Sequence, residues 1–199
     1  MSTTNNKSDH WPTNPTWHPD FAPSYTPKEM INLGIFEGIY THAIDGIPKD
    51  WLDSPKVLQR GGVPDPSLNQ YGVKSRQSLK EWEDKGWTTE HSPLGWWQWF
   101  CLYFLGRRIP GEDEKQIERW RGFIARHQAQ VTKACRLDDP ECHPRQRQGL
   151  LQWGWDSTTK FTPKQRDDNL KRVAKAAGCQ IGEAPAVEHF VGKPKSLGW

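Results

Sequence analysis

The stretch Leu94-Gly-Trp-Trp-Gln-Trp-Phe-Cys-Leu-Tyr-Phe-Leu105 decides the fold. Its side chains are apolar all round except for Gln98, and a helix without a polar face has to be buried on every side. At 12 residues it is too short to span a bilayer, which takes about 20 apolar residues. We therefore expect a central helix inside a globular core, which ends at the surface with Gly106, Arg107 and Arg108.

Tryptophan supplies much of the apolar surface that this core needs. The chain of 199 residues contains 12 Trp, although only 34% of its residues are hydrophobic and its mean hydropathy is -0.88. Disordered chains are poor in aromatic residues, and one buried Trp removes roughly 200 Å² from water. We therefore expect one folded domain whose core is small in residue number and large in area.

Helix start signals and apolar spacing predict further helices. Thr-Pro-Lys-Glu at 26–29 is a capping box with Pro at the first helical position, and we expect its helix to reach about Tyr40. A second capping box lies at 78–81, and apolar residues recur at spacings of three and four over 114–132. Further helices are expected from Pro144 through Trp155 and from Pro163 to Gly178. The sequence predicts an all-α single domain of about six helices around the Trp-rich one.

Prolines set both ends of the chain apart from this domain. Repeated Pro between residues 12 and 23 forbids a helix, so we expect an extended N-terminal arm over 1–24. Its first ten residues are expected to be disordered and the rest to lie on the domain surface. The helical domain then spans 25–180, and 181–199 form a Pro-containing tail. The irregular stretch 43–73 exceeds the usual loop length, which suits either a functional lid or a packed Ω-like loop.

Charge and missing motifs narrow the classes of function. The chain has 27 Lys+Arg against 24 Asp+Glu, a formal net charge of +3, well short of the basic pattern of a dedicated nucleic-acid binder. It contains no phosphate loop, dinucleotide glycine fingerprint, His-Glu-x-x-His or nucleophile elbow, so we expect no cofactor. The N-terminus lacks the apolar segment of a secretory signal, and we expect a cytosolic protein with no membrane partner.

Arginine and tryptophan are the residues that we expect to form a ligand pocket. Guanidinium groups pair with carboxylate and phosphate oxygens and stack on Trp faces, which suits an anionic or aromatic small molecule. We expect the pocket where the helix at 96–108 meets those at 114–132 and 144–156. Gly154, in the last of these, would leave room for a ligand or another backbone. The alternative is that these arginines form solvated faces paired with acidic neighbours. The predicted substrate-binding residues are Gln98, Arg107, Arg119, Arg126 and Trp153.

Two residues are candidates for acid–base catalysis. His127 lies on the apolar stripe of its helix, where burial can poise an imidazole near neutrality. The alternative is a core histidine that is hydrogen-bonded to a carbonyl. Asp156 ends the helix that begins at Pro144, where it could act as a catalytic carboxylate or simply cap the following segment.

The cysteines form a weak metal pattern. Six residues separate Cys135 from Cys142, which is wider than the usual zinc pair, and a fourth ligand beside His143 would have to come from elsewhere, such as Cys179. We therefore expect no bound metal. A disulfide could close this small loop but is disfavoured in a reducing compartment, so we expect two unlinked thiols.

Three functions remain open at this point. The first is a small-molecule enzyme or binder whose Arg/Trp-lined pocket supports non-redox acid–base or cation-stabilising chemistry. The second is a nucleic-acid-binding module in which Arg holds phosphates and Trp stacks on bases. The third is a structural or interaction protein that uses exposed Trp as interface anchors.

Overall fold

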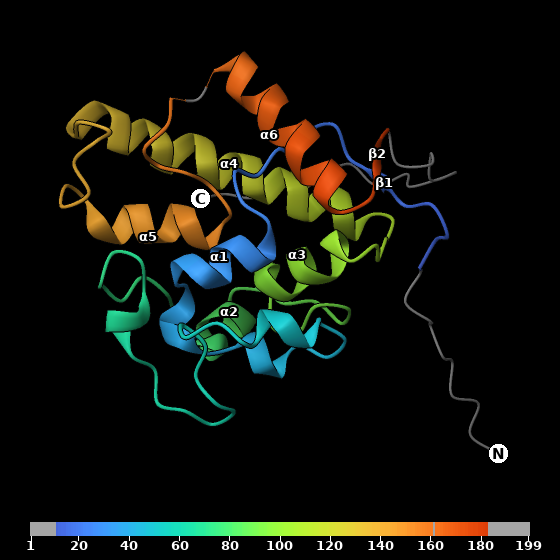
Figure 1. The fold of residues 1–199 in the computed structure, drawn as a ribbon, viewed down its shortest axis with the longest axis horizontal. Helices are drawn as coiled ribbons and strands as arrows, with labels where there is room; N and C mark the ends of the chain where they lie inside the picture. The colour runs from blue at the N-terminus through green and yellow to red at the C-terminus, as the bar shows by residue number, and fades with distance from the viewer. Residues whose placement is uncertain (1–10, 161, 183–199) are drawn as a thin grey trace.

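Helix α3 (Trp96–Phe104) lies inside the fold, as the sequence predicts (Figure 1). Seven of its nine residues are buried. Gly95 precedes the helix with a φ of 74°, and Gln98 caps its start because Leu94 N donates a hydrogen bond to Gln98 Oε1 at 2.9 Å. Neither α3 nor any other helix in the described chain has the length and apolar character needed to cross a membrane.

The computed structural model describes residues 11–160 and 162–182, and nearly all regular structure in this part is helical. Two-residue strands, β1 (Thr16–Trp17) and β2 (Gln180–Ile181), pair in parallel. For the described residues, a single all-α domain of six helices with an aromatic core is therefore confirmed. In chain order the other helices are α1 (Pro27–Leu33), α2 (Leu79–Asp84), α4 (Glu112–Ala134), α5 (Pro144–Gln152) and α6 (Pro163–Ala176), with 3-10 turns at Phe36–Gly38, Thr41–Ala43, Lys49–Trp51 and Pro66–Leu68.

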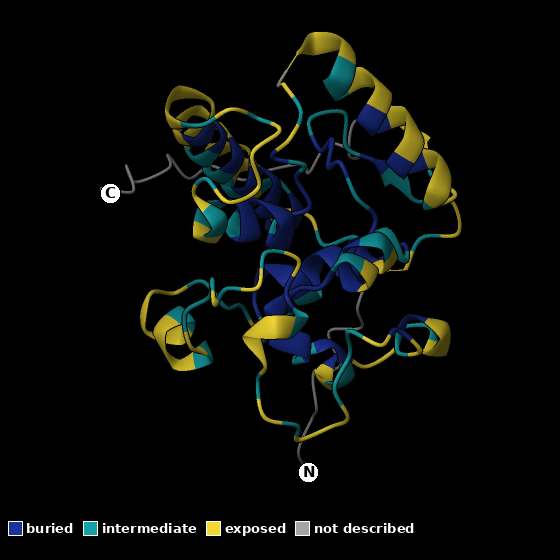
Figure 2. Ribbon diagram, turned by 60° about the vertical axis from the view of Figure 1, so that its left-hand side comes forward, coloured by how far each residue is buried: buried dark blue, intermediate teal, exposed yellow. Residues whose placement is uncertain are grey.

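The longest helix, α4, packs against both α3 and α5 (Figure 1). Two indole groups fix this arrangement: Trp120 Nε1 donates to Trp153 O at 2.8 Å, and Trp155 Nε1 donates to Gln128 Oε1 at 3.1 Å. Figure 2 shows buried residues where the elements meet and exposed residues along the outer side of the helices. This distribution is the one expected of amphipathic helices around a shared core.

The N-terminal arm enters the core, which corrects the expectation that it lies on the surface. Trp17 and Phe21 are completely buried. Burying such large rings is favourable even in a segment whose prolines prevent a helix. Residues 1–10 and the tail beyond residue 182 lie outside the described residues. The ring of Phe21 has centroid distances of 5.1–6.4 Å to those of Trp96, Trp99, Phe100, Tyr103 and Trp120.

Helix α1 ends at Leu33, which corrects the expectation that it reaches about Tyr40. Gly34 turns the chain with a φ of 101°, and its carbonyl accepts a hydrogen bond from Gln70 N at 3.0 Å. The Leu68 backbone lies so close that a side chain at position 34 would collide with it. Gly34 is thus a local stop signal for the helix, and the close contact with the distant turn also requires glycine at this position.

The stretch 43–73 packs against the domain in the manner of an Ω-like loop. Asp65 N donates to Glu37 O at 3.1 Å, and Glu37 N donates to the buried Asn69 at 2.8 Å. At the end of the stretch, Tyr71 N donates to Gln148 Oε1 at 3.1 Å. These bonds satisfy backbone groups that would otherwise be buried without partners.

Gly154 follows helix α5 instead of lying within it, which corrects the predicted helix end. Its φ is 72°, and its carbonyl accepts hydrogen bonds from Ser24 N at 2.7 Å and Tyr25 N at 3.2 Å. A side chain at this position would lie 3.2 Å from Pro23 Cβ. The predicted close approach of another backbone is therefore confirmed, and the N-terminal arm provides it.

Cys135 and Cys142 form a disulfide, which corrects the expectation of two unlinked thiols. Their Cα atoms are 5.8 Å apart because residues 136–141 turn back from the end of α4 to the start of α5. The buried Arg147 holds this loop from inside and donates hydrogen bonds to Arg136 O at 2.9 Å and Cys142 O at 2.8 Å. The length of the loop allowed a disulfide, and the expectation of unlinked thiols rested on a reducing compartment alone.

Asp113, in the first turn of α4, is buried against α3. Its carboxylate accepts hydrogen bonds from Trp99 Nε1 and Ile109 N, both at 2.8 Å. Burial raises the pKa of Asp113 from 3.8 to about 6, although these two hydrogen bonds oppose the shift. The folded state thus binds the proton more tightly than the unfolded state. The bound proton therefore stabilises the fold fully at pH values below the pKa of Asp113 in the unfolded chain. This stabilisation is lost as the pH rises through the pKa of Asp113 in the folded protein.

We predict that Asp113→Asn reduces the pH dependence of stability. Between about pH 4 and pH 7, the wild-type protein should lose about 3 kcal/mol of unfolding free energy relative to the variant, measured by urea titration at each pH. Asp138→Asn is the control, because the pKa of that exposed carboxyl is lowered by its hydrogen bond with Arg136 and the effect has the opposite sign. Wild-type and Asp113→Asn curves that run parallel would contradict the prediction.

A second prediction concerns the disulfide. After equilibration with oxidised glutathione and denaturation, thiol titration should find two free cysteines, Cys101 and Cys179. The double variant Cys135→Ser/Cys142→Ser should lose about 2.5 kcal/mol of unfolding free energy, because a small closed loop no longer restricts the unfolded chain. Cys179→Ser serves as the control. Four free thiols under these conditions would show that the link does not form.

Candidate functional site

A cavity of about 550 Å³ between the start of α3, α4 and α5 is the candidate site. The segment 74–77 and helix α2 contribute to its remaining wall. Pockets for small molecules have volumes of roughly 300–1,000 Å³ and are mostly apolar, with a few placed polar groups. The aromatic residues that line this one are Phe36, Trp82, Trp87, Trp96, Trp97, Phe123 and Trp153.

One wall of the cavity is a stack of rings from different parts of the helical core. The ring centroids of Trp96 and Trp153 are 4.7 Å apart, and those of Trp153 and Phe123 are 4.6 Å apart. The stack continues to His127, whose ring lies 4.3 Å from that of Phe123. Because each ring is held by its neighbour, this wall presents a rigid aromatic surface to a ligand.

Arg119 is a charged residue that lies beside the rings of this wall. Its guanidinium lies 5.8 Å from the centroid of Trp87 and 5.9 Å from that of Trp153. It donates hydrogen bonds to Trp87 O at 3.2 Å and Gln116 Oε1 at 3.1 Å, and burial lowers its pKa. Among the residues described by the structure, no carboxylate pairs with it. A desolvated charge without a counter-ion is costly, so this group is suited to an anion brought by a ligand.

Among the residues that the structure describes, the lining contains five cationic residues and no Asp or Glu. Arg76 differs from the others because it forms an ion pair with the buried Glu37, with Nη2 2.8 Å and Nε 3.2 Å from Oε2. This pair holds Arg76 in place and neutralises it. The remaining cationic lining residues are Lys74, Arg119, Arg126 and Arg145.

His127 borders the cavity as a neutral imidazole. Burial and the nearby Arg126 lower its pKa below 6.5, although a hydrogen bond with Gln130 opposes this shift. Its Nδ1 is buried and has no hydrogen-bond partner in the described chain. The lowered pKa keeps the ring uncharged near neutral pH, which is the state that a general base requires.

The structure brings four of the seven predicted site residues to the cavity: Arg119, Arg126, His127 and Trp153. Gln98 instead caps α3, and Asp156 accepts hydrogen bonds from the backbone N and the hydroxyl of Thr158 at 2.9 and 2.6 Å. The roles of all seven in function stay predictions.

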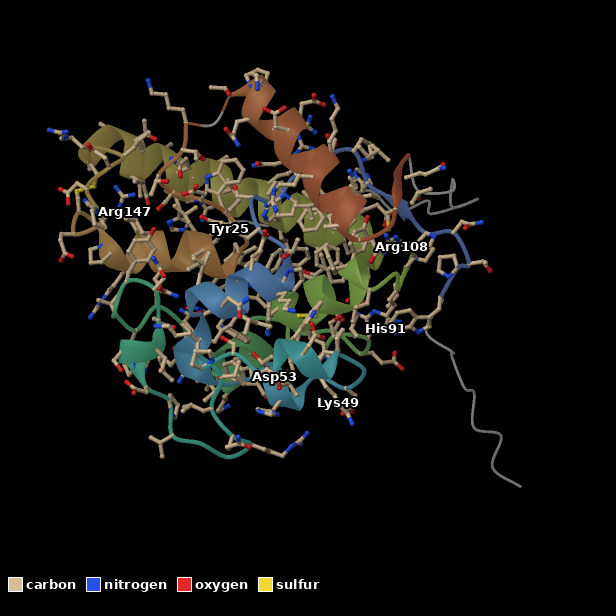
Figure 3. All side chains as sticks on the ribbon, in the orientation of Figure 1. Tyr25, Lys49, Asp53, His91, Arg108 and Arg147 are labelled. Atoms are coloured by element: carbon tan, nitrogen blue, oxygen red, sulfur yellow. A yellow bond between two sulfur atoms is a disulfide. The ribbon has the colours of Figure 1, made fainter. Side chains whose placement is uncertain are left out.

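Arg107 lies away from the cavity lining. It is buried and donates hydrogen bonds to His91 O at 2.7 Å and Ser92 Oγ at 2.9 Å. Figure 3 shows His91 and Arg108 together at one end of the molecule, with Arg147 at the opposite end beside α5. The hydrogen bonds of Arg107 to His91 and Ser92 fix the loop before α3.

The segment 74–77 is the part of the site that sequence reasoning missed. Ser75 Oγ donates to Arg145 O at 2.6 Å, and Gln152 Nε2 donates to Ser75 O at 2.5 Å, so both ends of α5 hold the segment. Gly149 faces it, and a side chain there would lie 3.5 Å from Ser75 Oγ. Trp82 and Trp87 were also missed. The capping box at 78–81 was a signal for the helix that carries Trp82, but nothing local indicated its packing partner.

One group of potential metal ligands, Cys135, Cys142 and His143, has its ligand atoms within 4.8 Å of one another in the described part of the chain. The two sulfur atoms are joined in the disulfide, however, and metal binding by cysteine requires the thiolate. The residues in this state do not fit a metal ion.

No family model matches the chain, and neither a curated protein nor a solved structure matches it. The evidence for function therefore comes from the cavity and its chemistry.

We predict that Arg119→Met changes the unfolding free energy by no more than about 1 kcal/mol, because relief of the desolvated charge offsets two lost hydrogen bonds. Arg147→Met is the matched comparison, since that buried arginine bonds several backbone carbonyls of the 136–142 loop. It should lose about 3 kcal/mol or more in the same urea titration. Equal losses in the two variants would mean that Arg119 is a structural residue.

Proposed function

We propose that the protein binds a small, flat, anionic molecule in this cavity, with Arg119 as the counter-charge. The observation that carries the proposal is the guanidinium held between Trp87 and Trp153 without a carboxylate partner in the described chain. Burial makes the interaction of that charge with an anion stronger than it would be in water. A bound anion would replace the counter-ion that the fold itself does not supply.

The aromatic wall supports the same class of ligand. Flat rings gain both apolar contact and favourable stacking against Trp153 and Phe123. The absence of acidic residues from the lining means that an anion meets no like charge there. An aromatic or otherwise planar anion therefore fits both the walls and the charge of the cavity.

Acid–base chemistry at this site would depend on His127. A general base has to lie within hydrogen-bond reach of the proton that it removes, and His127 borders the cavity whereas Asp156 does not. The binding proposal does not require catalysis. A cytosolic location likewise stays a prediction from the N-terminal sequence.

The alternative of an interaction protein with exposed Trp anchors receives less support. Of the tryptophans in the described chain, Trp11 is the exposed one, and the others are buried or partly buried. The nucleic-acid alternative keeps one supporting feature, the surplus of cations beside aromatic rings in the cavity.

A pair of fluorescent probes tests the proposal. Anilinonaphthalene sulfonate is a flat aromatic anion, and phenylnaphthylamine is its uncharged counterpart. We expect the anion to bind the native protein with a stoichiometry of one. Arg119→Met should weaken its binding about 10–100-fold and leave the binding of the neutral probe nearly unchanged.

Arg121→Met is the matched control, because Arg121 lies on the same helix, is paired with Asp20 and does not line the cavity. The affinity of the Arg121→Met variant for both probes should equal that of the wild-type protein. Anion binding that is unaffected by Arg119→Met, or that does not saturate, would refute the proposal.

A further inference from the structure

We propose that the ligand is a nucleoside phosphate, with its base against the aromatic wall and its phosphate held by the cations of the lining. This inference rests on the proposed function and specifies the ligand class of the same cavity. Three features of the cavity carry it: the number of its charges, their grouping at one edge, and the aromatic faces of its walls.

The cavity lining carries more positive charge than one carboxylate group of a ligand would balance. Among the described lining residues five are cationic and none is acidic; Glu37 neutralises Arg76, whereas Arg119 and Arg145 have no carboxylate partner in the described chain. Lys74 interacts with the more distant carboxylate of Glu81. A phosphate monoester carries nearly two negative charges at neutral pH and offers three acceptor oxygens, and guanidinium groups match this geometry.

Part of this charge gathers at one edge of the cavity. The hydrogen bond from Ser75 Oγ to Arg145 O joins the segment that carries Lys74 to the first turn of α5. The Arg145 side chain is exposed and has no partner among the residues that the structure describes, so it is available to a ligand. The positive end of the α5 helix dipole lies at the same edge and favours an anion further.

The aromatic walls offer flat ring faces to a ligand. The ring of Trp153 stacks on those of Trp96 and Phe123 at centroid distances of 4.7 and 4.6 Å, and all three residues line the cavity. A nucleobase is flat and stacks on aromatic side chains, while its phosphate pairs with cationic groups.

The same chemistry is present in a free nucleotide and in a nucleotide at the end of a single strand. Both have a base that stacks and a phosphate that pairs with Arg. A strand continues beyond the cavity and neutralises more cations, so its affinity falls more steeply with salt. The salt dependence of binding therefore distinguishes a free nucleotide from the end of a strand.

The test uses intrinsic Trp fluorescence and calorimetry with defined probes. The four ribonucleoside monophosphates are compared with adenosine, which lacks the phosphate, and with ribose phosphate and inorganic phosphate, which lack the base. At least one monophosphate should bind about tenfold or more tightly than each of these fragments. Arg145→Gln should weaken monophosphate binding about tenfold and leave adenosine binding unchanged.

Arg136→Gln is the control, because Arg136 is exposed, pairs with Asp138 and lies outside the lining. A phosphorylated tetranucleotide that binds more tightly than any monophosphate, with a steeper salt dependence, would identify a strand end as the source. Tighter binding of a monophosphate would identify a free nucleotide.

The inference is overturned if no monophosphate binds more tightly than ribose phosphate, or if Arg145→Gln has no effect on the binding of any monophosphate. If the sulfonate probe still binds through Arg119 in that case, the proposed function stands and only the ligand class is wrong. If neither the sulfonate nor any nucleotide binds, both proposals fail.

Discussion

The burial of Trp99 and Phe100 on helix α3 is the constraint on which the other elements depend. Both side chains are fully buried, and one helix cannot shield rings that point to all sides. The cover comes from distant parts of the chain: Phe21 of the arm lies 5.3 and 5.2 Å from the two ring centroids, and α1 and α4 both pack against α3. The domain is therefore held together by long-range aromatic contacts, which explains how a chain of low mean hydropathy folds.

Polar groups in the core have hydrogen-bond partners, whereas some of those at the cavity lack a partner. Buried Arg147 bonds several carbonyls, and Gln148 bonds Gly34 O at 3.0 Å, so these groups are satisfied and fix the loops around them. At the cavity, Arg119 has no carboxylate and the Trp96 indole has no acceptor in the described chain. Imperfect pairing at a cavity is typical of a functional site, where stability is given up for binding.

Local patterns predicted the elements of the fold and about half of the site. The unbroken apolar run located α3, and the three-four spacing placed Arg119, Arg126 and His127 on one helix. Gly34 is a local stop signal for α1 that the expected end near Tyr40 overlooked. The wall formed by the segment 74–77 could not be predicted, because it depends on residues that are far apart in the chain, and so does the aromatic partner of Phe21. The disulfide was missed for another reason: the short loop allowed it, but the thiols were expected to stay reduced in the cytosol.

The docking of the arm onto Gly154 has a consequence for the order of folding. Ser24 and Tyr25 leave the ribosome early, but the carbonyl that they bind is made only after most of the domain has been synthesised. Trp153 precedes this carbonyl and forms part of the cavity wall, so the wall reaches its final position late. Contacts between residues so far apart in sequence slow folding, because the intervening chain must be ordered before they can form. Until then the aromatic arm is exposed to chaperones and to other nascent chains.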